Sequence, residues 1–302
     1  MGKITGISWT DHTFNPWWGC TKVGGSPACE NCYAETLASR RGFDVWGNGT
    51  ERRFLKEGSW KQPVSWNRAA LKAGQRRRVF CMSMGDWAEG RPDQREHRER
   101  LWNVIEQTPG LDWLMLTKRP QSIRRLYPRA WQENPPLNVW MGTTAETQDW
   151  VDNRWAFLRQ VPAAVYWLSI EPLFERITLP DDFLSLGNRG WVIVGGESGH
   201  AASPMSPDWA RYLRDQCIEA GVRFHFKQWG EFAPDDGSNP TKQRAVVDGH
   251  QMVRLGKKAA GRVLDGRTWD EVPSPRIDLA WRPQVVPLFV FQPEMRMEGG
   301  AL

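Results

Sequence analysis

The chain has 302 residues, of which 40% are hydrophobic and 25% charged, and its formal net charge is +5. This composition is typical of a globular protein and excludes a disordered or collagen-like chain. No apolar run approaches the roughly 20 residues of a membrane helix, and residues 1–11 lack the features of a signal peptide, so we expect a soluble cytoplasmic protein without a membrane partner.

Short apolar runs alternate with helical stretches along the chain. The apolar runs predict strands at residues 4–9, 79–84, 113–117, 139–142, 165–170, 191–195 and 224–227. Helices are predicted over residues 93–108, from a capping box at 143–146 to about 159, and over 206–220 with Gly221 as the closing residue. The alternation predicts an α/β fold of parallel strands, as a full or partial (β/α) barrel.

Two segments fall outside this alternation. Residues 42–75 are predicted to be a charged insertion after the first strand, so residues 1–232 would form the barrel together with its insertion. Residues 233–302 would form a C-terminal extension, in which residues 246–253 predict a hairpin around the turn Asp248-Gly249. The Pro-spaced apolar stretch 282–293 predicts an edge strand.

Positive charge is concentrated in residues 40–129, which hold 20 Lys and Arg against 10 Asp and Glu. A one-sided basic surface suits a polyanion, so this region predicts a nucleic acid or a nucleotide as substrate. A solvated face with scattered ion pairs is the alternative. The 19 Trp do not separate the two, because indole rings fill cores and also stack on bases.

Polar and charged residues recur where the predicted strands end, which is where a parallel barrel places its functional groups. They are Ser83, Gly85, Asp86, Lys118, Arg119, Thr143, Ser169, Glu171, Gly195, Gly196, Glu197, Lys227 and Gln228. Capping and turn formation account for about half of such residues taken singly. Together they predict a polar pocket at one rim.

Three of the five cysteines, Cys20, Cys29 and Cys32, fall within thirteen residues, in a predicted loop that precedes a predicted helix over residues 30–41. Thiolates are ligands for zinc and for iron–sulfur clusters, and an odd number of cysteines argues against a disulfide framework. A closed zinc site needs a fourth ligand, which His12 could supply. Three cysteines alone fit a [4Fe–4S] cluster with one iron open to a non-protein ligand. Three unrelated buried thiols are the remaining alternative.

Several sequence blocks around these residues resemble a known family. They include Gly19-Cys20-Thr21, Cys29-Glu30-Asn31-Cys32-Tyr33, Leu116-Thr117-Lys118-Arg119-Pro120, Ser169-Ile170-Glu171-Pro172, Gly195-Gly196-Glu197-Ser198-Gly199, Lys227-Gln228-Trp229-Gly230 and Gly256-Lys257-Lys258. In these blocks the chain is similar to the three-Cys-motif proteins of phages and mobile elements, a family of unknown function related to radical S-adenosylmethionine enzymes. The Cys spacing departs from the C-x3-C-x2-C run usual in those enzymes. Asn31 and Ser203 also stand where an aromatic residue and Arg are expected.

The resemblance implies that the three cysteines hold a [4Fe–4S] cluster and that S-adenosylmethionine chelates its open iron. An external electron donor would reduce the cluster, and a 5′-deoxyadenosyl radical would attack the substrate. By position, the cofactor would contact Ser83, Gly85 and Asp86 with its amine, Ser169 and Glu171 with its ribose, and Gly195, Gly196 and Glu197 with its adenine. Its carboxylate or a substrate anion would contact Lys118, Arg119, Lys227 and Gln228, with Thr143 nearby.

Three functions stay open at this stage. The first is a radical enzyme that modifies or repairs a nucleic acid or nucleotide, with a three-Cys-motif protein as a further candidate partner. The second is a zinc protein that binds nucleic acid without catalysis. The third is a radical enzyme acting on a small molecule or peptide, in which case the Arg clusters are ordinary surface.

Overall fold

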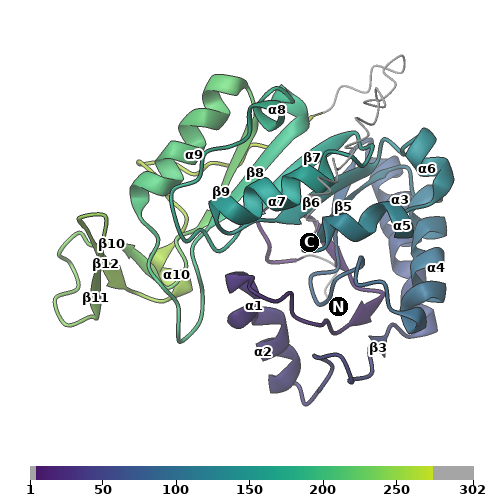
Figure 1. Ribbon diagram of the computed structural model, residues 1–302, viewed down its shortest axis with the longest axis horizontal. Coiled ribbons are helices and arrows are strands. Elements are labelled where there is room, and N and C mark those ends of the chain that lie inside the picture. The colour runs from purple at the N-terminus through teal and green to yellow at the C-terminus, as the bar shows by residue number, and fades with distance from the viewer. Residues whose placement is uncertain (1–4, 275–302) are drawn as a thin grey trace, which may run out of the picture.

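The computed structural model describes residues 5–274. At its centre lies a seven-stranded parallel sheet in the order β1-β4-β5-β6-β7-β8-β9, which curves into a half-barrel (Figure 1). Its strands are β1 (His12–Phe14), β4 (Arg77–Cys81), β5 (Leu111–Thr117), β6 (Val139–Thr144), β7 (Val165–Ile170), β8 (Gly190–Gly195) and β9 (Arg223–Gln228). The predicted α/β fold is confirmed, in the partial form of the barrel.

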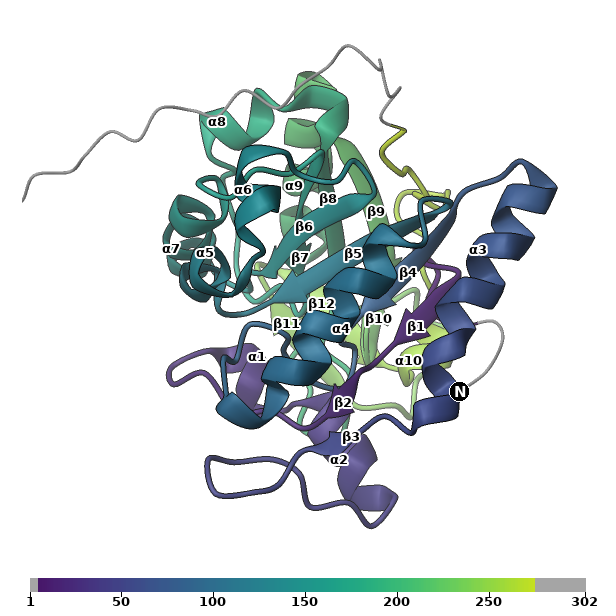
Figure 2. The same ribbon diagram turned by 90° about the vertical axis from the view of Figure 1, so that its right-hand side faces the viewer.

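Helices connect consecutive strands and cover one face of the sheet (Figure 2). They are α3 (Gln62–Ala73), α4 (Arg95–Glu106), α5 (Ile123–Leu126), α6 (Arg129–Glu133), α7 (Gln148–Leu158), α8 (Asp181–Leu184) and α9 (Pro207–Ala220). The predicted helices at 93–108 and 206–220 are confirmed as α4 and α9. The Ser206 hydroxyl caps α9 by accepting from the backbone N–H of Asp208, and Gly221 ends it at a φ of 69°.

The sheet has a hydrophobic core on each face, because successive side chains of a strand point to opposite sides. Val79, Met141 and Leu213 belong to the larger core, which lies between the strands and the helices. The concave face carries a second core that consists of Trp9, Phe80, Leu114, Trp140, Val165, Trp167, Trp191 and Ile193. Large indole rings therefore fill the space that inward-pointing side chains of all eight strands fill in a closed barrel.

Residues 5–9 are not a strand, so the prediction for the start of the chain is wrong. Trp9 inserts its indole into the concave core, with ring centroids 4.6 Å from Phe80 and 5.5 Å from Trp167. The Ser8 hydroxyl bonds the Nε2 atom of His225 on β9 at 2.9 Å. This segment thus links the two edge strands of the half-barrel. Its apolar residues fill the open side of the half-barrel. Composition alone does not distinguish such a segment from a strand.

The predicted capping box at residues 143–146 is also wrong. Thr143 and Thr144 are the last residues of β6, and α7 begins only after Thr147, whose hydroxyl accepts from the backbone N–H of Trp150 at 3.4 Å. Both threonines stay in the strand because β6 is a central strand that is buried on both faces. Glu146, the expected partner in the box, is instead fully buried.

Part of the expected insertion belongs to the regular fold. Residues 42–75 end in the helix α3, which connects β1 to β4 and packs on β4 and β5. The remainder carries β3 (Arg53–Phe54), which pairs with β2 (Trp17–Trp18).

The C-terminal part contains a three-stranded antiparallel sheet of β10 (Phe232–Pro234), β12 (His250–Arg254) and β11 (Arg244–Val247), followed by α10 (Lys257–Ala260). The predicted hairpin is confirmed, since Asp248 and Gly249 both have the positive φ that its tight turn requires. The predicted edge strand at 282–293 lies outside the described residues, and the division at residue 232 stays a prediction. None of the described helices is long and apolar enough to cross a membrane.

Gly142 offers a test of the concave core. A Cβ atom at this position would lie 2.2 Å from the indole of Trp167, on the neighbouring strand. Because the core is closely packed, we expect Gly142→Ala to lower the free energy of unfolding by about 1–3 kcal/mol in urea denaturation. Gly24→Ala is the control, since nothing lies within 4 Å of its Cβ position. Equal stability of the two variants would contradict this packing.

His225 makes the stability of the half-barrel depend on pH. Burial lowers the pKa of His225 from 6.5 to about 3, and the charge of Arg262 adds to this effect while that of Asp270 opposes it. The unfolded chain binds the proton more readily, so stability should fall as the pH drops below about 6.5, by up to about 1.4 kcal/mol per unit. Between about pH 7 and about pH 5, wild type should lose about 2 kcal/mol more than His225→Gln in denaturant titrations. Parallel losses in both proteins would exclude His225 as the cause.

Candidate functional site

A cavity of about 310 Å³ opens at the carboxyl ends of the strands. Its walls are the loops that follow β4, β5, β7, β8 and β9, together with the Cys-bearing segment 20–34, which we call the Cys loop. Parallel α/β folds bind their ligands at this rim. The volume lies at the low end of the range for small-molecule sites, roughly 300–1,000 Å³.

The structure brings nearly all of the predicted site residues together. The cavity is lined by Cys20, Cys29, Cys32, Ser83, Gly85, Asp86, Lys118, Arg119, Ser169, Glu171, Gly196, Glu197, Lys227 and Gln228. Thr143 and Gly195 do not line it. The Thr143 side chain turns to the opposite face, where its hydroxyl donates to the carbonyl of Thr117, and Thr144 lines the cavity instead. Gly195 lies behind the carboxylate of Glu171.

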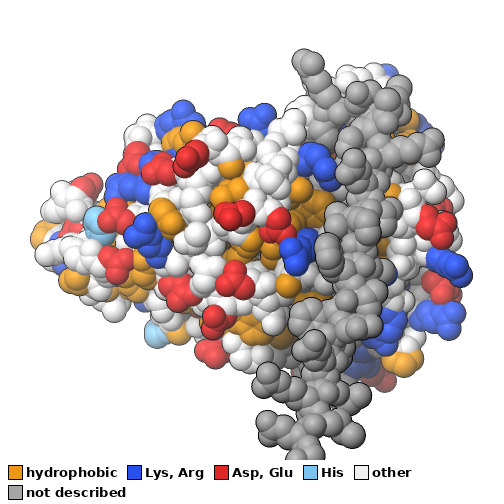
Figure 3. All heavy atoms as spheres, turned by 45° about the horizontal axis from the view of Figure 1, so that its top comes forward, with side chains coloured by type: hydrophobic (Ala, Val, Ile, Leu, Met, Phe, Trp, Pro, Cys, Tyr) orange, Lys and Arg blue, Asp and Glu red, His pale blue; other side chains and the backbone are white. Residues whose placement is uncertain are grey.

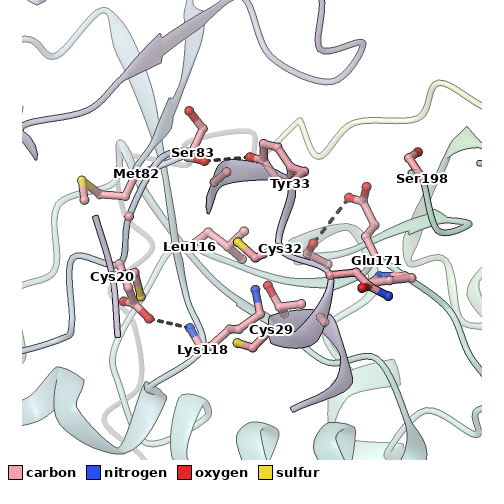
Figure 4. Close-up of a pocket in the computed structure, with 18 of the residues that line it drawn as sticks. Cys20, Cys29, Cys32, Tyr33, Met82, Ser83, Leu116, Lys118, Glu171 and Ser198 are labelled. Carbon is pink, nitrogen blue, oxygen red and sulfur yellow. Dashed lines mark hydrogen bonds between the residues drawn. The ribbon is translucent and has the colours of Figure 1, made fainter. Parts of the chain in front are cut away.

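The Cys loop is more helical than expected. A short helix, α1 (Pro27–Glu30), contains Cys29, and a second helix, α2 (Tyr33–Arg40), begins directly after Cys32. The sequence predicted one helix over residues 30–41 and no helix between the ligands. The break at Asn31 turns the chain so that both cysteines line the cavity. Figure 4 shows the three cysteines and Lys118 in one part of the cavity, with Glu171 and Ser198 in another.

The thiols fit one of the two predicted metal groups better than the other. Within residues 5–274, no three Cys, His, Asp or Glu side chains gather closely enough to hold a single metal ion. His12, the expected fourth zinc ligand, stacks on Trp66 at 4.3 Å and is not among the residues that line the cavity. A [4Fe–4S] cluster instead binds each thiolate through a different iron, so its ligands lie further apart than those of one ion. Three free thiols on one cavity wall provide that donor set.

Asp86 and Arg119 support Cys20 from behind. The buried Asp86 carboxylate accepts from the Thr117 hydroxyl at 2.6 Å, from the backbone N–H groups of Ala88 and Lys118, and from the guanidinium of Arg119 at 2.8 Å. Arg119 in turn donates to the Cys20 sulfur at 3.5 Å. Burial raises the pKa of Cys20 to about 12; Asp86 adds to this effect, whereas the Arg119 charge opposes it. In this structure Asp86 holds Arg119 against the thiol.

Two further carboxylates anchor the Cys loop to the strand ends. Glu146, after β6, accepts from the Ser26 hydroxyl and pairs with Arg154 at 2.7 Å, with both side chains at most 1% exposed. Glu197, after β8, accepts from the Asn31 amide at 2.9 Å and from the backbone N–H of Ser203 at 2.8 Å. No role in the site was predicted for Glu146, because the predicted capping box accounted for this residue. Glu197, which was predicted to contact the cofactor, lines the cavity and also holds the segment between Cys29 and Cys32.

The glycines after β8 and β9 have a structural reason. A Cβ atom on Gly196 would lie 1.9 Å from the carbonyl oxygen of Trp229, and one on Gly230 would lie 2.1 Å from the carbonyl oxygen of Glu197. The two loops therefore cross in direct backbone contact, which only glycine permits. This packing accounts for Gly196 without any contact to an adenine.

Several of the arginines in residues 40–129 form ion pairs. Arg52 is buried and pairs with Glu89 at 2.6 Å, and the same carboxylate accepts from the backbone N–H of Thr21, next to Cys20. Exposed pairs join Arg76 to Asp112, Arg77 to Asp11, Arg91 to Asp93 and Arg100 to Glu57. On the face shown in Figure 3, acidic and basic side chains are also interspersed. Scattered ion pairs are therefore present, and binding of a polyanion by residues 40–129 stays a prediction.

Several residues that line the cavity had no predicted role. Trp9 and Phe80 belong to the concave core and also contribute apolar wall. Lys257 reaches the cavity from α10, beyond the last strand of the half-barrel. It stands in a block that carried the family resemblance, but no strand end placed it at the rim.

Glu146 offers a test of how the Cys loop is held. Glu146→Gln should lower the free energy of unfolding by about 3–5 kcal/mol, because it leaves the charge of Arg154 buried without a partner. Glu35→Gln is the control, since it removes a partly exposed pair with Lys22 and should cost about 1 kcal/mol or less. Urea denaturation measures both. Losses of the same size would show that the Glu146 pair does not hold the loop.

Comparison with known proteins places the chain in a family. Residues 4–273 match the profile of DUF5131, which is described as a protein of unknown function. No curated protein and no solved structure matches the chain. Because the match includes the Cys loop, all seven strands of the half-barrel and α10, the chain belongs to the DUF5131 family.

Proposed function

We propose that this protein is a radical S-adenosylmethionine enzyme in which Cys20, Cys29 and Cys32 hold a [4Fe–4S] cluster. One observation carries the proposal: three free thiols from one loop line a single cavity at the carboxyl rim of a parallel half-barrel. Three thiolates leave one iron of such a cluster without a protein ligand, which permits chemistry beyond electron transfer.

A cluster held by these three cysteines would, when reduced, supply the electron for cleavage of S-adenosylmethionine to methionine and a 5′-deoxyadenosyl radical, and that radical would take a hydrogen atom from the substrate. The protein supplies positioning and exclusion of water. Arg119, held by Asp86, places a positive charge at the Cys20 sulfur and opposes the rise in pKa that burial causes. Trp9 and Phe80 provide apolar wall, which limits the access of water to a reactive intermediate.

The cavity also constrains the substrate. A cavity of about 310 Å³ that would also receive the cofactor excludes a folded duplex and admits only a small group of the substrate. We therefore propose a nucleotide, a single base displaced from a nucleic acid, or a small molecule of similar size as the group that reacts.

The proposal is tested by anaerobic purification and reconstitution. Wild type should bind about four irons and four sulfides per chain and should form 5′-deoxyadenosine from S-adenosylmethionine after reduction with dithionite. Alanine variants of Cys20, Cys29 and Cys32 should lose both properties. Cys217→Ala is the control, because this thiol is buried in α9 and does not line the cavity.

Two outcomes would count against the proposal. Bound zinc without sulfide would favour the non-catalytic zinc protein. Cluster assembly that survives the loss of any one of the three cysteines would show that the Cys loop is not the ligand set.

A further inference from the structure

The part of the cavity that faces away from the Cys loop holds a second group of polar side chains. Lys227 and Gln228 follow β9, Glu171 follows β7, Ser198 follows β8, and Lys257 comes from α10. We call these five residues the β7–β9 subsite. The three cysteines and Arg119 belong to the other part of the cavity.

The two lysines of the β7–β9 subsite differ in how they are neutralised. The ammonium of Lys227 forms an ion pair with Glu171. Lys257 makes no ion pair with any residue between 5 and 274. Burial, and then the charge of Lys227, lower the pKa of Lys257, whereas the carboxylates of Glu171 and Glu231 oppose this effect. An anion bound beside Lys257 would stabilise its charged form, because this ammonium forms no ion pair of its own within residues 5–274.

Neutral donors complete the subsite. The Gln228 amide donates to the Ser198 hydroxyl oxygen at 3.0 Å. Because that oxygen already accepts a bond, the hydroxyl hydrogen of Ser198 is available to a ligand. The ammonium of Lys257 and the hydroxyl of Ser198 are then the donors left for a ligand, and they match an anionic group with several acceptor oxygens.

We propose that the β7–β9 subsite binds an anionic group of the substrate, a phosphate or a carboxylate, and that Lys257 determines this specificity. The proposal rests on the proposed function, since it names the substrate class of the same cavity. It also gives the C-terminal sheet a role: β10 and β12 carry α10, and α10 brings Lys257 to the rim of the half-barrel.

The test is calorimetric titration of the anaerobically purified full chain, without S-adenosylmethionine or reductant. The probes are pyrophosphate for a phosphate-bearing substrate and succinate for a carboxylate-bearing one. We expect one of them to bind, and we expect Lys257→Gln to weaken that binding by about tenfold or more, as for the loss of one charged hydrogen bond. Lys258→Gln is the matched control, because it removes the same charge from the same helix at a residue that does not line the cavity.

Three results would overturn the proposal. The first is that neither probe binds wild type. The second is that Lys257→Gln and Lys258→Gln weaken binding equally, which indicates a general effect of net charge. The third is that Lys257→Gln weakens S-adenosylmethionine binding as much as probe binding, which assigns Lys257 to the cofactor. Anion binding by a wild-type protein that assembles no cluster after reconstitution would refute the proposed function and leave the subsite standing.

Discussion

Three buried carboxylates hold the Cys loop against the ends of the parallel strands, and the cavity exists because of them. Asp86 fixes the guanidinium that touches Cys20, Glu146 binds the start of α1, and Glu197 binds the residue between Cys29 and Cys32. Each carboxylate is largely removed from water, so moving the loop would cost the hydrogen bonds that Ser26 and Asn31 donate to Glu146 and Glu197 and the contact between Cys20 and Arg119. The loop is therefore tied to three different strand ends.

Large side chains, rather than further strands, fill the open side of the half-barrel. Four indoles and Phe80 fill the concave face, and the segment before β1 reaches across to His225 on the opposite edge strand. Because Trp9 belongs to this plug and also lines the cavity, the packing that stabilises the fold forms part of the wall of the site. Fold stability and cavity shape are consequently coupled through the same side chains.

The concentration of positive charge along the sequence does not indicate which cations face the cavity. Residues 40–129 are strongly basic as a segment, yet Arg52 is internal and several other arginines pair with carboxylates from distant segments. The cations that line the cavity are Lys22, Lys118, Arg119, Lys227 and Lys257, and only two of these five belong to that basic segment. Charge relevant to a ligand is thus set by which strand ends meet at the rim.

The alternation of apolar runs with helices determined the α/β class, and the rule that parallel strands end at one rim correctly predicted that Asp86, Lys118 and Glu171 share one cavity. Local patterns failed where tertiary contacts override them: residues 5–9 pack as a plug, and Glu146 binds Arg154 instead of capping a helix. Only the tertiary structure brought Lys257 to the rim. Contacts between segments far apart in the chain depend on how the sheet curves, and no local periodicity records that curvature.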